Sequence, residues 1–189
     1  QVQFGDYTWS RNNKDGVTPL QGIKNRVNKN TAIHYAKGCS LTSLDTSGIA
    51  EAVEAAKNSE VAVIFGGSAS AALARDYKSS TCGEGFDLND LNLTGAQSQL
   101  IREVYRTGTP VILVLVTGKP FVIEWEKNNL PAILVQWYAG EQAGNSIADI
   151  LFGEVVPSGR LTFSFPRSTG HLPVYYLSLI HISEPTRLL

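Results

Sequence analysis

Three short runs of apolar residues constrain the fold of this chain more than any other feature of its sequence. They occupy residues 61–65, 110–116 and 132–136. Residues 110–116 read Pro-Val-Ile-Leu-Val-Leu-Val and give the strongest strand signal in the chain. A strand that is apolar on both of its faces is buried on both, as in a parallel sheet that helices cover. The three runs are therefore predicted to be buried strands.

Stretches with helical periodicity lie between and around these runs. Pro19 follows Thr18, which suits the first position of a helix. Ser47 is the predicted N-cap of a second helix, and Thr94 with Gln97 forms a capping-box pattern before a third. Further helices are predicted over residues 121–128 and 144–152, and weaker strands over residues 31–35 and 161–165.

The alternation of strands and helices predicts an α/β fold, in which a mostly parallel sheet carries helices on both faces as an α/β sandwich. Ligands of such sheets bind beyond the carboxyl ends of the strands. The segment of residues 66–93 leaves the first run at such an end and is longer than an ordinary connection. Long connections in compact domains are usually functional, so we expect the site in this segment.

Composition argues against several classes of function. The net charge of −1 gives no electrostatic reason to expect a nucleic acid or an anionic membrane as partner. No apolar run approaches the roughly 20 residues that span a bilayer. The three histidines and two cysteines lack the spacing of a zinc site, so we expect neither a metal nor a cofactor. Cys39 and Cys82 could form a disulfide or both be free thiols, and the sequence leaves this open.

One carboxylate in the long segment, Glu84, stands between Gly83 and Gly85. Taken alone, it is more simply explained as a solvated loop carboxylate. Flexible backbone on both sides also allows such a group to enter a cleft as a proton donor or acceptor. For the neighbouring Asp87 and Asp90, a role in holding the loop is favoured over a catalytic one.

Other residues near the predicted strand ends carry weaker signals. Gly66 and Gly67 follow a strand as in phosphate-binding turns, but no dinucleotide-binding or Walker spacing follows them. Ser68 lacks the G-x-S-x-G pattern of a hydrolase nucleophile. Trp137 and Tyr138 could stack on a sugar or complete the core, and the core is favoured.

Several motifs in a fixed order resemble a known family. The main ones are Gly83-Glu84-Gly85-Phe86-Asp87 and, after it, Leu91-Asn92-Leu93-Thr94-Gly95-Ala96-Gln97. Together they resemble the second domain of glycoside hydrolase family 3, the β-glucosidase and β-xylosidase group. Leu88 departs from the pattern, because many relatives have Arg there. Shorter matches lie at residues 5–9, 18–20, 117–120, 137–142, 157–161 and 171–176.

The resemblance implies a retaining glycosidase that removes terminal β-linked glucose or xylose, without choosing between the two sugars. It matches Glu84 to the acid/base of the family and assigns the nucleophile to an Asp of a preceding barrel domain, which this chain lacks. The expected partners are a glycoside or oligosaccharide substrate and that barrel domain, and the chain alone is expected to be inactive. Family resemblance also implies a periplasmic or extracellular location.

Residues 1–176 are expected to be the C-terminal domain of this family, truncated at both ends and without its first strand. Residues 177–189 resemble a translated sequencing-library adapter and are set aside. Two alternatives stay open from the sequence. One is a flavodoxin-like cofactor-binding module, which only Gly66 and Gly67 support, and the other is a structural domain without a catalytic role.

Overall fold

The computed structural model of the chain describes residues 2–5, 8, 13–70, 80–85 and 88–174. The tail predicted at residues 177–189 lies outside this part of the chain. No helix in the described ranges is long and apolar enough to cross a bilayer. The helices and strands are, in chain order, η1 (Val2–Phe4), η2 (Asn13–Asp15), α1 (Pro19–Arg26), α2 (Ile49–Lys57), β1 (Ala62–Gly67), α4 (Gln97–Tyr105), β2 (Val111–Val116), α5 (Glu124–Asn129), β3 (Ala132–Val135), η3 (Gly140–Gln142), α6 (Ala143–Leu151) and η4 (Thr169–His171).

The three strands form one parallel sheet in the order β1-β2-β3. Ala62 pairs with Val111 at the start of the first ladder, and Ile112 pairs with Ala132 at the start of the second. The central strand, β2, is buried along almost its whole length, whereas β1 and β3 are mostly half-buried. All three predicted apolar runs are thus confirmed as strands, and their direction confirms the parallel sheet.

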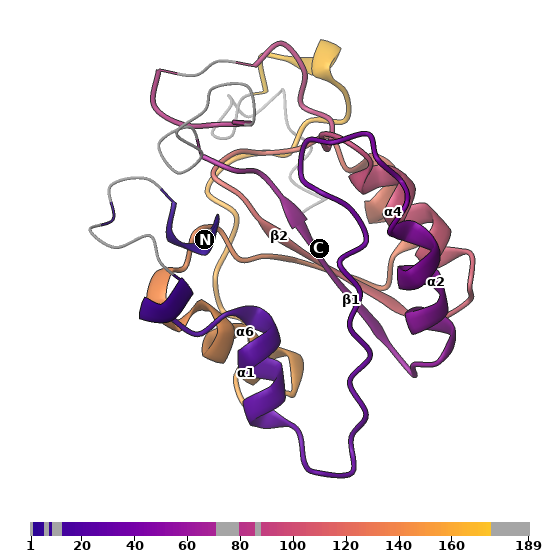
Figure 1. Cartoon of the computed structure of the whole chain (residues 1–189). Coiled ribbons are helices and arrows are strands. Elements are labelled where there is room, and N and C mark those ends of the chain that lie inside the picture. The colour runs from indigo at the N-terminus through magenta and orange to yellow at the C-terminus, as the bar shows by residue number, and fades with distance from the viewer. Residues whose placement is uncertain (1, 6–7, 9–12, 71–79, 86–87, 175–189) are drawn as a thin grey trace.

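Helices cover both faces of the sheet, as Figure 1 shows. The pair α2 and α4 lies on one face, and the pair α1 and α6 lies on the other. A sheet with two covered faces requires apolar side chains on both, which explains the continuous apolar runs of its strands. The fold is the predicted α/β sandwich.

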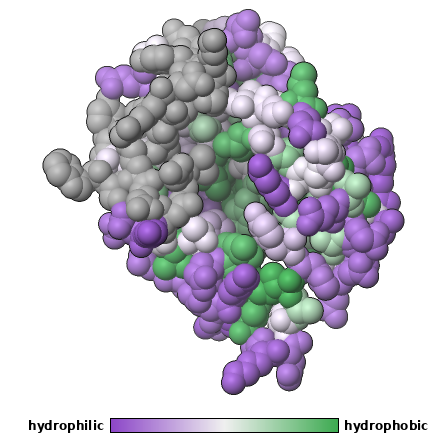
Figure 2. All heavy atoms as spheres, in the orientation of Figure 1, coloured by the Kyte–Doolittle hydropathy of each residue, from purple (hydrophilic) through white to green (hydrophobic). Residues whose placement is uncertain are grey.

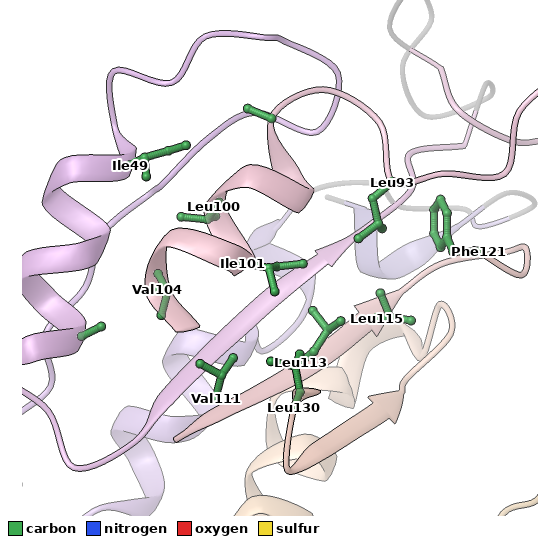
Figure 3. Close-up of a cluster of buried hydrophobic side chains, with 12 residues drawn as sticks. Ile49, Leu93, Leu100, Ile101, Val104, Val111, Leu113, Leu115, Phe121 and Leu130 are labelled. Atoms are coloured by element: carbon green, nitrogen blue, oxygen red, sulfur yellow. The ribbon is translucent and has the colours of Figure 1, made fainter. Parts of the chain in front are cut away.

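The larger core lies between the sheet and the pair α2 and α4 (Figure 3). Leu113 and Leu115 of β2 are fully buried there, and Ile101 and Val104 of α4 face them. Burial of one such side chain stabilises the folded state by about 1.5–3 kcal/mol. On the outside, hydrophilic residues dominate the rim of the face seen in Figure 2, and hydrophobic residues line part of a hollow near its centre.

The contact between α1 and α6 depends on two glycines. A Cβ atom on Gly22 would lie 1.9 Å from the carbonyl oxygen of Gly144, and one on Gly144 would lie 2.1 Å from the carbonyl oxygen of Thr18. The two helix backbones therefore touch directly, and no larger side chain fits between them. Helix α1 begins as predicted, because the Thr18 hydroxyl accepts a hydrogen bond of 3.3 Å from the backbone N–H of Gln21.

Two predicted strands are wrong. Residues 31–35 and 161–165 belong to no strand or helix. Most of residues 31–35 are exposed, so the apolar pattern there has no sheet to join. In the second segment, Phe163 and Phe165 stack on each other with ring centroids 5.8 Å apart. Their side chains thus find apolar neighbours without a strand ladder.

Two predicted helix caps are also wrong. Gly48, not Ser47, is the N-cap of α2, and the N–H of Ser47 donates to the Asp45 carboxylate at 2.9 Å instead. Helix α4 has Ala96 as its N-cap and begins at Gln97, so Gln97 is at the first helical position and not at the third, which a capping box requires. The Gln97 amide nonetheless donates to the Thr94 carbonyl at 3.2 Å, so the two residues of the pattern do meet.

Candidate active site

The carboxyl ends of all three strands meet in a group of hydrogen-bonded side chains. Ser68 follows β1, Thr117 follows β2, and Tyr138 comes three residues after the end of β3. We call these three residues, together with Cys82, the carboxyl-end cluster. The Ser68 hydroxyl lies 2.9 Å from that of Thr117 and 2.8 Å from that of Tyr138.

Cys82 joins this cluster from the long segment that follows β1. Its thiol lies 2.9 Å from the Tyr138 hydroxyl and donates to the Ser68 hydroxyl at 3.3 Å. Ser68 and Thr117 are fully buried, and Cys82 is buried as well. Buried polar groups are costly unless they find partners, and here the partners are one another.

Backbone contacts fix the same segment beside the continuation of β1. The Thr81 N–H donates to the Ala69 carbonyl at 2.9 Å, and the Ala69 N–H donates to the Thr81 hydroxyl at 2.8 Å. Ser70 and Cys82 pair as an isolated parallel bridge. Thr81 and Cys82 thus lie beside Ala69 and Ser70, and Cys82 reaches the buried cluster.

Glu84 follows this anchored stretch after a single residue. It lies in a turn and is exposed, with Gly83 at φ 132° before it and Gly85 at φ 68° after it. Both values lie in the region that residues with a side chain rarely adopt, so each position requires glycine. At an extended rise of 3.3–3.6 Å per residue, the Cα atom of Glu84 is at most about 7 Å from that of Cys82.

The far side of the loop is held by Asp90. Its carboxylate accepts hydrogen bonds from the Asn92 N–H at 3.0 Å and from the Thr169 hydroxyl at 3.2 Å. These bonds, the first above all, hold the pKa of the Asp90 carboxyl below its usual range. Figure 1 shows the loop and the turn η4, which contains Thr169, together beyond the end of β1. Asp90 has the loop-holding role that the sequence favoured, whereas Asp87 lies outside the described residues.

Lys119 carries a charge at the same end of the sheet. It is only 9% exposed, and its ammonium lies 4.7 Å from the centre of the Phe121 ring. No hydrogen-bond acceptor for this ammonium is found in the described part of the chain. Burial lowers the pKa of Lys119, and the nearby Cys82 and Asp90 oppose that shift in part.

Tyr138 remains a neutral donor in the cluster. Burial, and then the contact with Cys82, raises the pKa of its hydroxyl above the ordinary value of 10.0. The backbone before it is unusual, because Trp137 has a φ of 55°. The Trp137 ring meets Phe163 edge to face at 5.1 Å between centroids, so Trp137 packs on protein as the sequence favoured.

The sequence did not single out Ser68 or Thr117 as members of a site. Each is the first polar residue after an apolar strand, and Thr117 also begins the family match at residues 117–120. The glycine pair before Ser68 does not present a free backbone donor at Gly67. The Gly67 N–H donates to the Gln97 side-chain oxygen at 2.8 Å, and the Gln97 amide donates back to the Gly67 carbonyl at 3.0 Å.

No group of three or more potential metal ligands occurs among residues 2–5, 8, 13–70, 80–85 and 88–174. Cys39 and Cys82 are both free thiols, which answers the pairing question that the sequence left open. The loop therefore offers an exposed carboxylate, Glu84, two residues after a buried, hydrogen-bonded thiol.

Comparison with protein families identifies the family to which this chain belongs. The model of the glycosyl hydrolase family 3 C-terminal domain matches residues 1–188. The chain belongs to this family. The match includes the loop with Glu84 and the ends of all three strands, so the cluster and the loop lie within a family 3 domain.

Curated relatives carry glycosidase names. A β-xylosidase of Formosa agariphila is 44% identical over 161 residues, which are 85% of this chain and 21% of the relative. A periplasmic β-glucosidase of Salmonella typhimurium is 40% identical over 185 residues and is covered over 23% of its length. The family 3 chain thus spans about one fifth of the length of these relatives.

Solved structures agree with the family assignment. A β-glucosidase from Listeria innocua, in complex with isofagomine, superposes with a TM-score of 0.78 at 30% identity. This match covers 94% of the family 3 chain and 23% of the Listeria protein. An exo-β-xylosidase in complex with a xylobiose aziridine probe gives a TM-score of 0.67 at 29% identity and covers 77% of the chain.

Proposed function

We propose that this chain is the acid/base-bearing domain of an exo-acting, retaining β-glycosidase. The family match over residues 1–188 is the observation that carries the proposal. Relatives named β-xylosidase and β-glucosidase support terminal β-linked xylose or glucose as the substrate class. The relative named periplasmic supports a location outside the cytoplasm.

In this proposal, Glu84 is the acid/base. A retaining glycosidase needs a carboxylic acid that protonates the departing oxygen and later, as carboxylate, takes a proton from water. Glu84 suits this role because it is exposed and follows an anchored stretch at the carboxyl ends of parallel strands. The thiol of Cys82, two residues before Glu84, is held by the hydroxyls of Ser68 and Tyr138, which anchors the start of the turn.

The nucleophile comes from outside this chain. Its carboxyl group has to lie about 5–5.5 Å from that of Glu84 for retention of configuration. We propose that an Asp of a preceding barrel domain provides it, so that the active site is completed at the boundary between two domains. The chain covers only about one fifth of its relatives, which leaves ample length for such a domain. It follows that the 189-residue chain alone does not turn over glycosides.

Replacement of Glu84 tests this role in the full-length enzyme. Glu84→Gln removes the transferable proton but keeps the size of the side chain. We expect turnover of glycosides with poor leaving groups to fall by about 10²–10⁴-fold, because proton transfer contributes this much. Aryl glycosides with activated leaving groups need little protonation and should lose far less in the glycosylation step.

Glu60→Gln is the matched control, because Glu60 is an exposed carboxylate just before β1, at the opposite end of the sheet. It should leave both substrate types unaffected. Equal losses on poor and activated leaving groups in Glu84→Gln would remove the proton-transfer role. Full activity of that variant would favour a structural domain without a catalytic part.

A further inference from the structure

Glu84 lies in a short turn between two glycines. Gly83 and Gly85 flank it with positive φ values of 132° and 68°. Among the described residues, no atom lies within 4 Å of the position that a Cβ on Gly85 would take. Efficient proton transfer requires a carboxyl group within about 0.5 Å of its productive position. The anchored residues before the turn contribute to that precision.

Cys82 is the buried side chain closest to Glu84 in the sequence on that anchored side. One residue separates the two, and the thiol of Cys82 lies 2.9 Å from the hydroxyl of Tyr138. Tyr138 belongs to the segment after β3, which is 56 residues away in the sequence. The contact therefore connects the loop to the opposite edge of the sheet.

Tyr138 itself is held firmly. A Cβ on Gly5 would lie 2.6 Å from the Tyr138 ring, and a Cβ on Gly118 would lie 2.8 Å from it. Two glycine backbones thus clamp the ring from different segments. The hydroxyl is fixed as well, because it also lies 2.8 Å from the Ser68 hydroxyl.

The backbone before Tyr138 is strained in a way that fits this function. Trp137 has a φ of 55°, a conformation that is unfavourable for a residue with a side chain. Such strain persists only where surrounding contacts impose it. Here it accompanies the turn that brings Tyr138 from the end of β3 to Ser68 at the end of β1.

We propose that Tyr138 is a positioning residue for Glu84, which it orients through the hydrogen bond to Cys82. The inference rests on the proposed acid/base role of Glu84. Tyr138 touches no reacting atom in this account. Its hydroxyl fixes Cys82, and Cys82 fixes the start of the short glycine-flanked turn that presents the carboxyl group.

A double-mutant cycle in the full-length enzyme tests the inference. Tyr138→Phe removes one hydroxyl and keeps the clamped ring. We expect kcat for glycosides with poor leaving groups to fall by about ten- to a hundredfold, as for a small misplacement of a catalytic group. KM should change little. In a Glu84→Gln background, the same substitution should cause no further loss, because the group that it positions is gone.

The outcomes distinguish a failure of the positioning role of Tyr138 from a failure of the acid/base role of Glu84. If Tyr138→Phe lowers kcat by the same factor in both backgrounds, Tyr138 acts on general stability and the inference is wrong, while the role of Glu84 stands. If Glu84→Gln shows no selectivity for poor leaving groups, the proposed function fails, and the inference fails with it. Tyr105→Phe is the control, since Tyr105 ends α4 at the other end of the sheet and is 38% exposed.

Cys82 provides a second route if Tyr138→Phe does not fold. Cys82→Ser keeps a hydrogen-bonding group within reach of Tyr138, whereas Cys82→Ala removes it. We expect Cys82→Ser to retain most of the kcat for poor leaving groups and Cys82→Ala to lose about ten- to a hundredfold, again without a change in KM. Equal activity of the two variants would overturn the inference.

Discussion

The two ends of the parallel sheet are built from different chemistry. At the carboxyl ends, buried hydroxyls of Ser68 and Thr117 bond to each other and to Tyr138. At the amino ends, the hydroxyls of Ser59 and Thr107 donate to nearby backbone carbonyls. Thr109 likewise donates to the Ala56 carbonyl at 2.9 Å, and Tyr105 packs edge to face on Trp125 at 5.3 Å between centroids.

The difference shows at which end of the sheet the fold buries hydroxyl groups, whose removal from water is unfavourable. Burying a hydroxyl is unfavourable unless its hydrogen bonds are replaced, so a sheet with no site has no reason to collect several of them at one end. The amino ends close with ordinary turns, and the Ala62 N–H donates to the Pro110 carbonyl at 2.9 Å. At the carboxyl ends, the polar side chains of the carboxyl-end cluster instead support the loop that carries Glu84.

Removal of one hydroxyl at each end gives the largest stability contrast. Thr117→Val keeps the shape of the side chain but leaves the buried N–H and carbonyl of Lys119 without the Thr117 hydroxyl, and it removes one of the hydrogen bonds of Ser68. We expect a loss of about 1–3 kcal/mol in the free energy of unfolding by urea, because buried groups are left unsatisfied. Thr109→Val should cost only about 0.5–1.5 kcal/mol, since its single bond is half-buried. A larger loss at Thr109 would break the contrast between the two ends.

The charge of Lys119 gives a smaller effect with a defined dependence on pH. Burial lowers its pKa from the ordinary 10.5, so the folded protein binds this proton less tightly than the unfolded chain does. Between the lowered value and 10.5, the unfolded chain carries more protons, and stability therefore rises as the pH rises. Below the lowered pKa, the free-energy cost of burying the charged Lys119 ammonium no longer changes with pH.

Lys119→Met removes both the free-energy cost of the buried charge and the pH dependence of that cost. We expect an equal or higher melting temperature at neutral pH and a smaller gain in stability between the lowered pKa and 10.5 than in the parent chain. Lys127→Met is the control, because the side chain of Lys127 is 66% exposed. A clear drop in melting temperature for Lys119→Met, with Lys127→Met unchanged, would show that the Lys119 ammonium has a stabilising partner.

The strands could be predicted from the sequence because burial on both faces leaves a continuous apolar run that few other structures need. The same reasoning failed for residues 161–165, where Phe163 and Phe165 stack on each other and not along a ladder. Apolar content alone therefore does not separate a strand from an irregular segment that packs through its aromatic rings.

The cluster could not be predicted, because its members become neighbours only through the fold. Ser68 is 49 residues from Thr117 and 70 residues from Tyr138, and no local spacing connects them. Glu84 is different. Its residue type and flanking glycines were compatible with a solvated loop carboxylate. The surrounding family motif made it a candidate for the catalytic acid/base. Its catalytic role stays a prediction.

The most direct test of that role uses a small anion as a substitute for the missing base. Glu84→Ala in the full-length enzyme should hydrolyse activated aryl β-glycosides slowly, because water lacks base assistance in the second step. Azide needs no deprotonation, so we expect it to accelerate turnover and to yield the β-glycosyl azide. An α-glycosyl azide would make Glu84 the nucleophile, and an absence of acceleration together with unchanged turnover in water would contradict any acid/base role.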